Sequence, residues 1–191
     1  HQTSKVRTAN PFIQYFINHY GKTKWENYLD REKVDSDFFL VYDEQLSPQF
    51  ALDLAGKMIE NGILKPNNLD SLVKTVKDPN THGLLQNNYR NMHSSRELVV
   101  SFFNLIDRYE ANFAYQLEEA SAKSLMLSIK PREHMKEIDY RNETLGDFLC
   151  RYKKKYISEF SSISGDRPAL VVEKECHFHG SDQCVYQVQL A

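Results

Sequence analysis

The chain has 191 residues, of which 41% are hydrophobic and 12% aromatic, enough for one sizeable core or a core with a small helical appendage. Its formal net charge of -2, from 24 basic and 26 acidic residues, argues against nucleic acid or an anionic membrane as a partner. The apolar runs are only a few residues long, far short of the roughly 20 that cross a bilayer, so we expect no membrane segment.

The first part of the chain has the spacing of helices. In residues 10–30, apolar side chains recur at helical intervals after a start signal at Asn10, which predicts a helix interrupted at Gly21. A second helix is predicted from Pro48 to a glycine stop at Gly62, and a third short helix within 67–77.

The loop-forming stretch KDPNTHG at 77–83 is the predicted boundary between two domains. Residues 1–80 form an N-terminal helical region, which we expect to serve dimerisation or to act as a linker. Residues 81–191 form a second domain.

The second domain alternates between helical and strand periodicity. Helical spacing predicts helices at 94–110 and 143–160, and alternating apolar residues predict strands at 112–118, 124–130, 168–178 and 184–190. The last two strands are joined by a turn in which Gly180 adopts positive φ. The order of elements predicts an α+β fold, an antiparallel β-sheet faced by helices, with an N-terminal helical region.

The three cysteines all lie after residue 149. An odd number argues against a secreted disulfide framework and for a reducing compartment, so we expect a cytoplasmic protein. Cys150 lies on a predicted helix, Cys176 at the end of a strand and Cys184 at the start of the next strand. A hairpin would bring the last two within reach of one ion, and the alternative is that all three are small buried hydrophobic residues.

Glu173 offers an oxygen ligand from the same strand as Cys176. Alternation along a flat strand would point the two side chains to opposite faces, so both bind one metal only if the strand bends or bulges near Lys174 or Glu175. Thiolates with one carboxylate suit zinc, and a zinc ion with four protein ligands has no open position for water. Such a site is structural.

The pattern Cys-x22-Glu-x2-Cys-x7-Cys, from Cys150 through Glu173 and Cys176 to Cys184, resembles the zinc-binding signature of the 4-vinyl reductase domain. This domain is the sensory part of aromatic-responsive bacterial transcription activators. The match needs no gap and extends to Tyr156, to Ser158 and to the Gly180 turn. The resemblance implies that Cys150, Glu173, Cys176 and Cys184 bind a structural zinc ion.

His177 and His179 follow Cys176 closely and are the obvious competing ligands, because imidazole is the commonest metal donor. The corresponding positions are not ligands in the family that the sequence resembles. We therefore expect a half-exposed hairpin tip, with either histidine as a reserve ligand if Glu173 points away. Asp147, one helical turn before Cys150, is a weaker reserve.

The resemblance also implies a function. The 4-vinyl reductase domain belongs to a wider group with haem-based nitric-oxide sensors and subunits of Golgi trafficking complexes. In its bacterial sensory members a small molecule enters an apolar pocket between sheet and helices. We therefore expect a ligand-binding sensory module of a bacterial signal-transduction protein that binds a small apolar molecule. The candidate pocket residues are Phe102, Phe103, Tyr115, Ile129, Tyr152 and Tyr156, although an aromatic stripe at helical spacing is more often plain core.

Two departures from the family limit what the resemblance implies. Phenol sensors orient their ligand with a tryptophan and a histidine, whose positions fall on Ile129 and near Ser101, so phenols are not expected ligands. Haem-based members hold propionates with a Tyr-x-Ser-x-Arg motif. Here Tyr156 and Ser158 are followed by Phe160 in place of the arginine, so haem is not expected either.

No motif for catalysis is present, since the chain has no GxSxG elbow, Gly-rich phosphate loop or HExxH helix, and we expect no enzyme. We expect a homodimer formed through the N-terminal helices, with an output domain in the full-length chain. The alternative is a protein-interaction or scaffold module of the same group that binds no small molecule.

Overall fold

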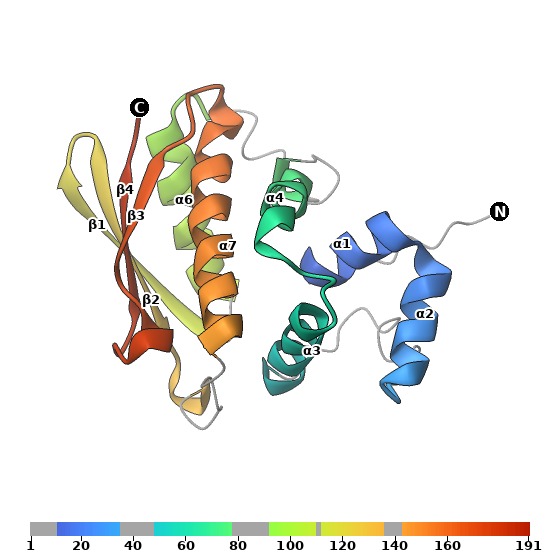
Figure 1. Cartoon of the computed structure of the whole chain (residues 1–191). Coiled ribbons are helices and arrows are strands. Elements are labelled where there is room, and N and C mark those ends of the chain that lie inside the picture. The colour runs from blue at the N-terminus through green and yellow to red at the C-terminus, as the bar shows by residue number, and fades with distance from the viewer. Residues whose placement is uncertain (1–10, 35–47, 78–91, 110–111, 136–142) are drawn as a thin grey trace.

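The computed structural model describes residues 11–34, 48–77, 92–109, 112–135 and 143–191. These ranges contain a helical N-terminal part followed by a four-stranded antiparallel sheet with helices packed on it (Figure 1). The predicted α+β fold class is confirmed. None of the helices in these ranges combines the length and hydropathy that a membrane span needs.

The N-terminal helices begin and end where the sequence predicts. They are α1 (Pro11–Tyr20), α2 (Lys22–Arg31), α3 (Pro48–Glu60), the short 3-10 helix η2 (Pro66–Asn68) and α4 (Leu69–Lys77). Gly21 separates α1 from α2 with φ 85°, and Gly62 follows α3 with φ 67°. Both angles lie in the left-handed region, where a side chain is strained, so glycine at these positions determines where the helices end.

The C-terminal part is built on a sheet of β1 (Phe113–Ser121), β2 (Ser124–Pro131), β3 (Leu170–Glu175) and β4 (Cys184–Gln189). The strand order is β1-β2-β4-β3, with every pair antiparallel, so β3 is an edge strand. Two helices, α6 (Ser95–Tyr109) and α7 (Glu143–Ser161), cover one face of this sheet (Figure 1). Leu125, Leu127 and Ile129 alternate along β2 toward this interior.

The N-terminus of α6 is held by side chains from two parts of the chain. The Glu97 backbone N–H donates to Ser94 Oγ at 3.2 Å, and the His93 N–H donates to the Glu97 carboxylate at 3.4 Å, an arrangement close to a capping box. Asp166, 71 residues after Ser95, accepts a hydrogen bond from the Ser95 N–H at 2.7 Å. The Ser94 and Glu97 contacts are local in the chain, whereas the contact with Asp166 depends on the fold.

Helix α7 lies between the sheet and the N-terminal helices and has a buried surface toward each (Figure 1). Cys150, Ile157 and Phe160 pack in the cluster that faces the sheet. Leu145 and Phe148 pack instead with the helices of the N-terminal part, in a cluster that contains Phe12, Ile13, Tyr15, Phe16, Trp25, Tyr28, Leu29, Leu54, Ala55, Met58, Leu64 and Leu72. The predicted domain boundary at residue 80 lies outside the described residues.

Candidate metal centre

Four side chains with metal-binding atoms meet where α7 contacts the β3–β4 hairpin. They are Cys150 on α7, Glu173 on β3, Cys176 just after β3 and Cys184 at the start of β4. One sulfur or carboxylate oxygen of each lies within 4.8 Å of the others. The cysteines are free thiols, and the sulfurs of Cys150 and Cys176 are 3.1 Å apart, well beyond the roughly 2.05 Å of a disulfide. The structure therefore brings together all four predicted ligand residues.

The bulge that the sequence requires in β3 is present. Glu173 pairs with Tyr186 and Glu175 with the adjacent Val185, so Lys174 is an extra residue in the ladder. This irregularity changes the face to which later side chains point. Glu173 and Cys176 consequently reach the same cluster although they are three residues apart, and the predicted bend near Lys174 is confirmed.

The cluster is shielded from water, and one of its oxygens has no hydrogen-bond partner. The cysteines are 3%, 7% and 1% exposed for Cys150, Cys176 and Cys184. Glu173 Oε1 is buried and accepts no hydrogen bond from the described residues, while Oε2 lies 3.5 Å from Lys154 Nζ. A buried carboxylate oxygen without a partner is costly, and a cation in the cluster would remove that cost.

The three thiols differ in how readily they lose a proton. A hydrogen bond from Cys150, together with the positive charge of Lys153, lowers the pKa of Cys184 to about 5. The same hydrogen bond and burial raise the pKa of Cys150, and burial raises the pKa of Cys176. Cys184 is therefore the first thiolate to form, and a bound metal must displace the protons of the other two.

The hairpin tip holds its histidines away from the four-residue cluster. The 3-10 helix η6 (His177–His179) follows Cys176, and Gly180 ends it with φ 96°. His177 Nδ1 lies 2.9 Å from the Ser181 carbonyl oxygen, and His179 Nε2 lies 3.1 Å from Asp147 Oδ1. The predicted reserve ligands His177, His179 and Asp147 are therefore outside the cluster and engaged with other groups.

A close contact between Gly146 on α7 and Phe178 on η6 was missed by the sequence analysis. A Cβ atom at position 146 would lie 2.6 Å from Phe178 Cβ and 2.7 Å from its Cγ, so only glycine allows this approach. The signal in the sequence was a glycine inside an otherwise well-formed helix, which often marks close packing. The Phe178 contact and the His179–Asp147 contact fasten the hairpin tip on α7 beside the cysteines.

The six predicted pocket residues lie together on the side of the sheet that faces the helices. Phe102, Phe103 and Ile129 are buried there, and Tyr115, Tyr152 and Tyr156 pack against the same cluster. The ring centroids of Phe102 and Tyr156 are 5.8 Å apart, as are those of Phe103 and Tyr115. The six residues therefore share one location. Their role as the wall of a ligand pocket stays a prediction.

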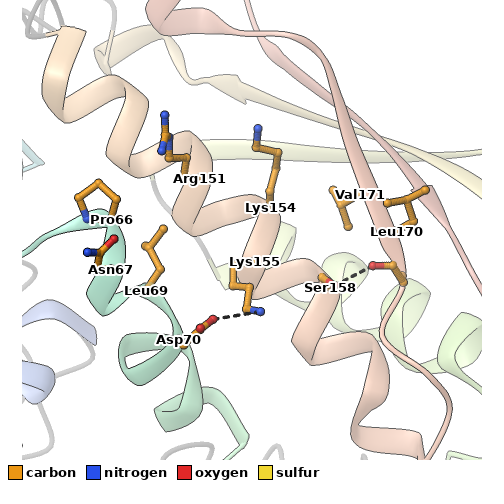
Figure 2. A pocket seen from close by; sticks show the side chains of 11 residues that line it. Pro66, Asn67, Leu69, Asp70, Arg151, Lys154, Lys155, Ser158, Leu170 and Val171 are labelled. Atoms are coloured by element: carbon orange, nitrogen blue, oxygen red, sulfur yellow. Dashed lines mark hydrogen bonds and ion pairs between the residues drawn. The ribbon is translucent and has the colours of Figure 1, made fainter.

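A separate groove of about 720 Å³ lies on the surface between α4, α7 and β3 (Figure 2). None of the six predicted pocket residues lines it. Its walls come from Pro66, Asn67, Leu69, Asp70, Arg151, Lys154, Lys155, Ser158, Ala169, Leu170 and Val171.

The fold and the metal cluster can be compared with known proteins. The sequence matches no family model, and no curated protein matches it. Solved structures do match. An H-NOX protein from S. oneidensis in the Fe(II)NO ligation state superposes with a TM-score of 0.69 at 10% identity, over 98% of this chain and 99% of that chain.

Two further H-NOX structures have the same architecture. The Fe(II) unliganded H-NOX protein from K. algicida gives a TM-score of 0.58 at 13% identity, over 96% of this chain and 94% of that chain. The IWP-051-bound H-NOX from Shewanella woodyi gives a TM-score of 0.63 at 9% identity, over 95% of this chain and 91% of that chain. The chain therefore has the fold of H-NOX domains, which fall within the wider haem-nitric-oxide group implied by the sequence resemblance. At these identities the likeness concerns the fold alone.

Because these similar structures contain Fe(II), the described residues can be tested for a haem site. Haem iron needs an axial side chain, most often a histidine that reaches the interior. The described histidines are all exposed or half-buried, and α6, which packs on the sheet, carries no histidine. The described residues therefore do not fit a histidine-ligated haem. The five histidines are His19, His93, His134, His177 and His179.

Proposed function

We propose that this chain is a sensory module in which a structural zinc ion joins α7 to the β3–β4 hairpin. The observation that carries the zinc assignment is the enclosed cluster of three thiols and one carboxylate oxygen that has no hydrogen-bond partner among the described residues. Ligand atoms around a tetrahedral zinc with bonds of about 2.3 Å are about 3.8 Å apart, close to the spacing of this cluster.

The chemistry of the donors supports a structural role for the metal. Four protein ligands complete a zinc tetrahedron and leave no position for an activated water. The Lys153 charge and the His177 backbone N–H, which donates to Cys184 Sγ at 3.4 Å, favour the thiolate that zinc requires. In this proposal the metal therefore carries no reaction, and the chain is not an enzyme.

The sensory part of the proposal rests on the fold and on the aromatic interior between sheet and helices. Tyr152 adds a hydroxyl group to that interior, and burial raises its pKa, which keeps the group neutral and able to donate a hydrogen bond. A small apolar molecule held there would contact α7, which packs on both parts of the chain. A change at α7 would thereby reach the N-terminal helices.

The scaffold alternative finds less support. A protein-interaction module needs a continuous exposed apolar surface. Among the described residues, the large apolar side chains that are exposed are Tyr20 on α1 and Leu170 and Val172 on β3. Three side chains on two distant elements do not form such a surface, so we favour the sensory function.

Metal analysis tests the zinc assignment. The purified protein should contain about one zinc per chain, and Cys176→Ser should lose it together with thermal stability. His177→Ala and His179→Ala are matched controls, because they change the residues next to Cys176 and should keep the metal. A metal-free protein of unchanged stability would contradict the proposal, and loss of zinc in a histidine variant with retention in Glu173→Gln would contradict the ligand set.

A ligand screen tests the sensory function. Small apolar molecules should raise the melting temperature in a thermal-shift assay or remain bound in native mass spectrometry. Tyr152→Phe should weaken a hit that contains a hydrogen-bond acceptor while leaving the unliganded melting temperature nearly unchanged. A broad screen without any stabilising compound, together with a partner protein captured by the folded domain, would favour the scaffold.

In this proposal the module dimerises through its N-terminal helices and passes the ligand signal to an output domain of the full-length protein in the cytoplasm. Size-exclusion chromatography with light scattering tests the dimer, and a monomer at micromolar concentration would contradict it.

A further inference from the structure

The groove between α4, α7 and β3 is lined by more cationic than acidic side chains. One face of α7 presents Arg151, Lys154 and Lys155 to it at helical spacing, and the only acidic side chain among its lining residues is Asp70. Two further carboxylates outside the lining, Glu159 and Glu173, lie against Lys155 and Lys154.

The three cations differ in the partners that they already have. Lys155 Nζ lies 3.1 Å from Asp70 and 3.2 Å from Glu159, and Lys154 Nζ lies 3.5 Å from Glu173. Arg151 is exposed and forms no ion pair within the described ranges of the chain. Its guanidinium, which can bind a carboxylate or phosphate through two parallel hydrogen bonds, is therefore available to a ligand.

Apolar side chains line two other sides of the groove. Leu69 lies on the α4 side, and Leu170 and Val171 lie on the β3 side (Figure 2). Leu170 is 61% exposed, so a ligand that covered it would remove apolar surface from water. In Figure 2 the nitrogen ends of Arg151 and Lys154 point the same way, with Leu170 and Val171 beside Lys154. Cationic and apolar groups thus line the same groove.

We propose that this groove binds a small amphiphile with one anionic head group, a carboxylate or a phosphate monoester. The head group binds the Arg151 guanidinium, with Lys154 adding a second positive charge, and the tail covers Leu170 and Val171. A volume of about 720 Å³ suits a molecule of this size. None of the aromatic residues proposed for the interior pocket lines this site, and it adjoins the metal cluster through Lys154, which lies 3.5 Å from Glu173.

Isothermal titration calorimetry of the whole chain with octanoate and octyl phosphate tests the proposal. Acetate carries the charge without the tail, and octanamide carries the tail without the charge. Arg151→Gln removes the head-group contact, and Leu170→Ser removes an exposed tail contact without opening the core. Lys130→Gln is the matched control, because Lys130 is an exposed cation on β2 that does not line the groove.

At least one of the two charged probes should bind, at least about tenfold more tightly than acetate or octanamide. Arg151→Gln should weaken the binding of that probe about tenfold, and Leu170→Ser should weaken it a few-fold. Lys130→Gln should leave its affinity unchanged. The tighter of the two charged probes identifies the head group. The proposal is overturned if neither charged probe binds, if octanamide binds as tightly as octanoate, or if the affinity is the same in Arg151→Gln, since binding would then occur elsewhere.

Discussion

Gly146→Ala tests how the β3–β4 hairpin is fastened to α7. The new methyl group would lie 2.6 Å from Phe178 Cβ, whereas ordinary contact begins at 3.4 Å, so the two elements must separate by about 0.8 Å. Phe178 Cβ is attached directly to the backbone of η6, and rotation of the phenyl ring cannot relieve the clash. The backbone of η6 itself must move.

The expected free-energy change combines two opposing effects. Overpacking of this kind costs about 1–3 kcal/mol, while replacing a helical glycine by alanine stabilises a helix by about 1 kcal/mol. We expect a net loss of about 1 kcal/mol in the free energy of unfolding. Because η6 lies between Cys176 and Cys184, the shift also reaches two proposed ligands and should weaken zinc binding by about tenfold or more.

Urea unfolding with and without a chelator measures the stability change, and competition with a zinc-binding dye measures the affinity. The double variant Gly146→Ala/Phe178→Gly is the control, because glycine at position 178 removes the Cβ, Cγ and Cδ1 atoms that the new methyl group would meet. Relative to Phe178→Gly alone, the added alanine should then be neutral or stabilising. A single Gly146→Ala variant that is more stable by about 1 kcal/mol and keeps its zinc affinity would refute the reasoning.

Four further predictions concern the metal and the α6 cap. Removing zinc with a chelator should lower the melting temperature, and the zinc affinity should fall as the pH is lowered because protons compete for the thiolates, both measurable by calorimetry. Lys154→Gln should speed zinc release to a dye a few-fold, whereas Lys130→Gln should not, because only Lys154 contacts Glu173. The Ser95 N–H holds the pKa of Asp166 below its usual range, so this carboxylate stabilises the fold above about pH 4 and the contribution is lost as the pH falls through the lowered pKa. Asp166→Asn should therefore lower the melting temperature at pH 7, measured by circular dichroism. The melting temperature of the variant should also fall less on acidification than that of the unchanged protein. An equal fall in the two proteins would contradict this.

Local pattern was enough to predict the elements of this protein. Helical and alternating periodicity located α1, α7 and the four strands, and Gly21 and Gly62 marked helix ends because their backbone angles exclude other residues. The resemblance to a zinc-binding signature implied that the cysteines and Glu173 form one cluster, and the bulge at Lys174 followed from it, because strand alternation would otherwise separate two ligands. The elements, the helix ends and the bulge depend on residues near one another in the chain or on the geometry of a single strand.

The tertiary structure alone decided which distant surfaces meet. Three contacts depend on how separate elements pack. They are the approach of Phe178 to Gly146, the contact of Lys154 with the second carboxylate oxygen of Glu173, and the hydrogen bond of Asp166 to the backbone of Ser95, 71 residues earlier. The charged groove likewise joins three elements that no sequence pattern links. Periodicity and spacing report local geometry, whereas such contacts arise from the relative positions of whole elements, which are determined by the shape of the shared core.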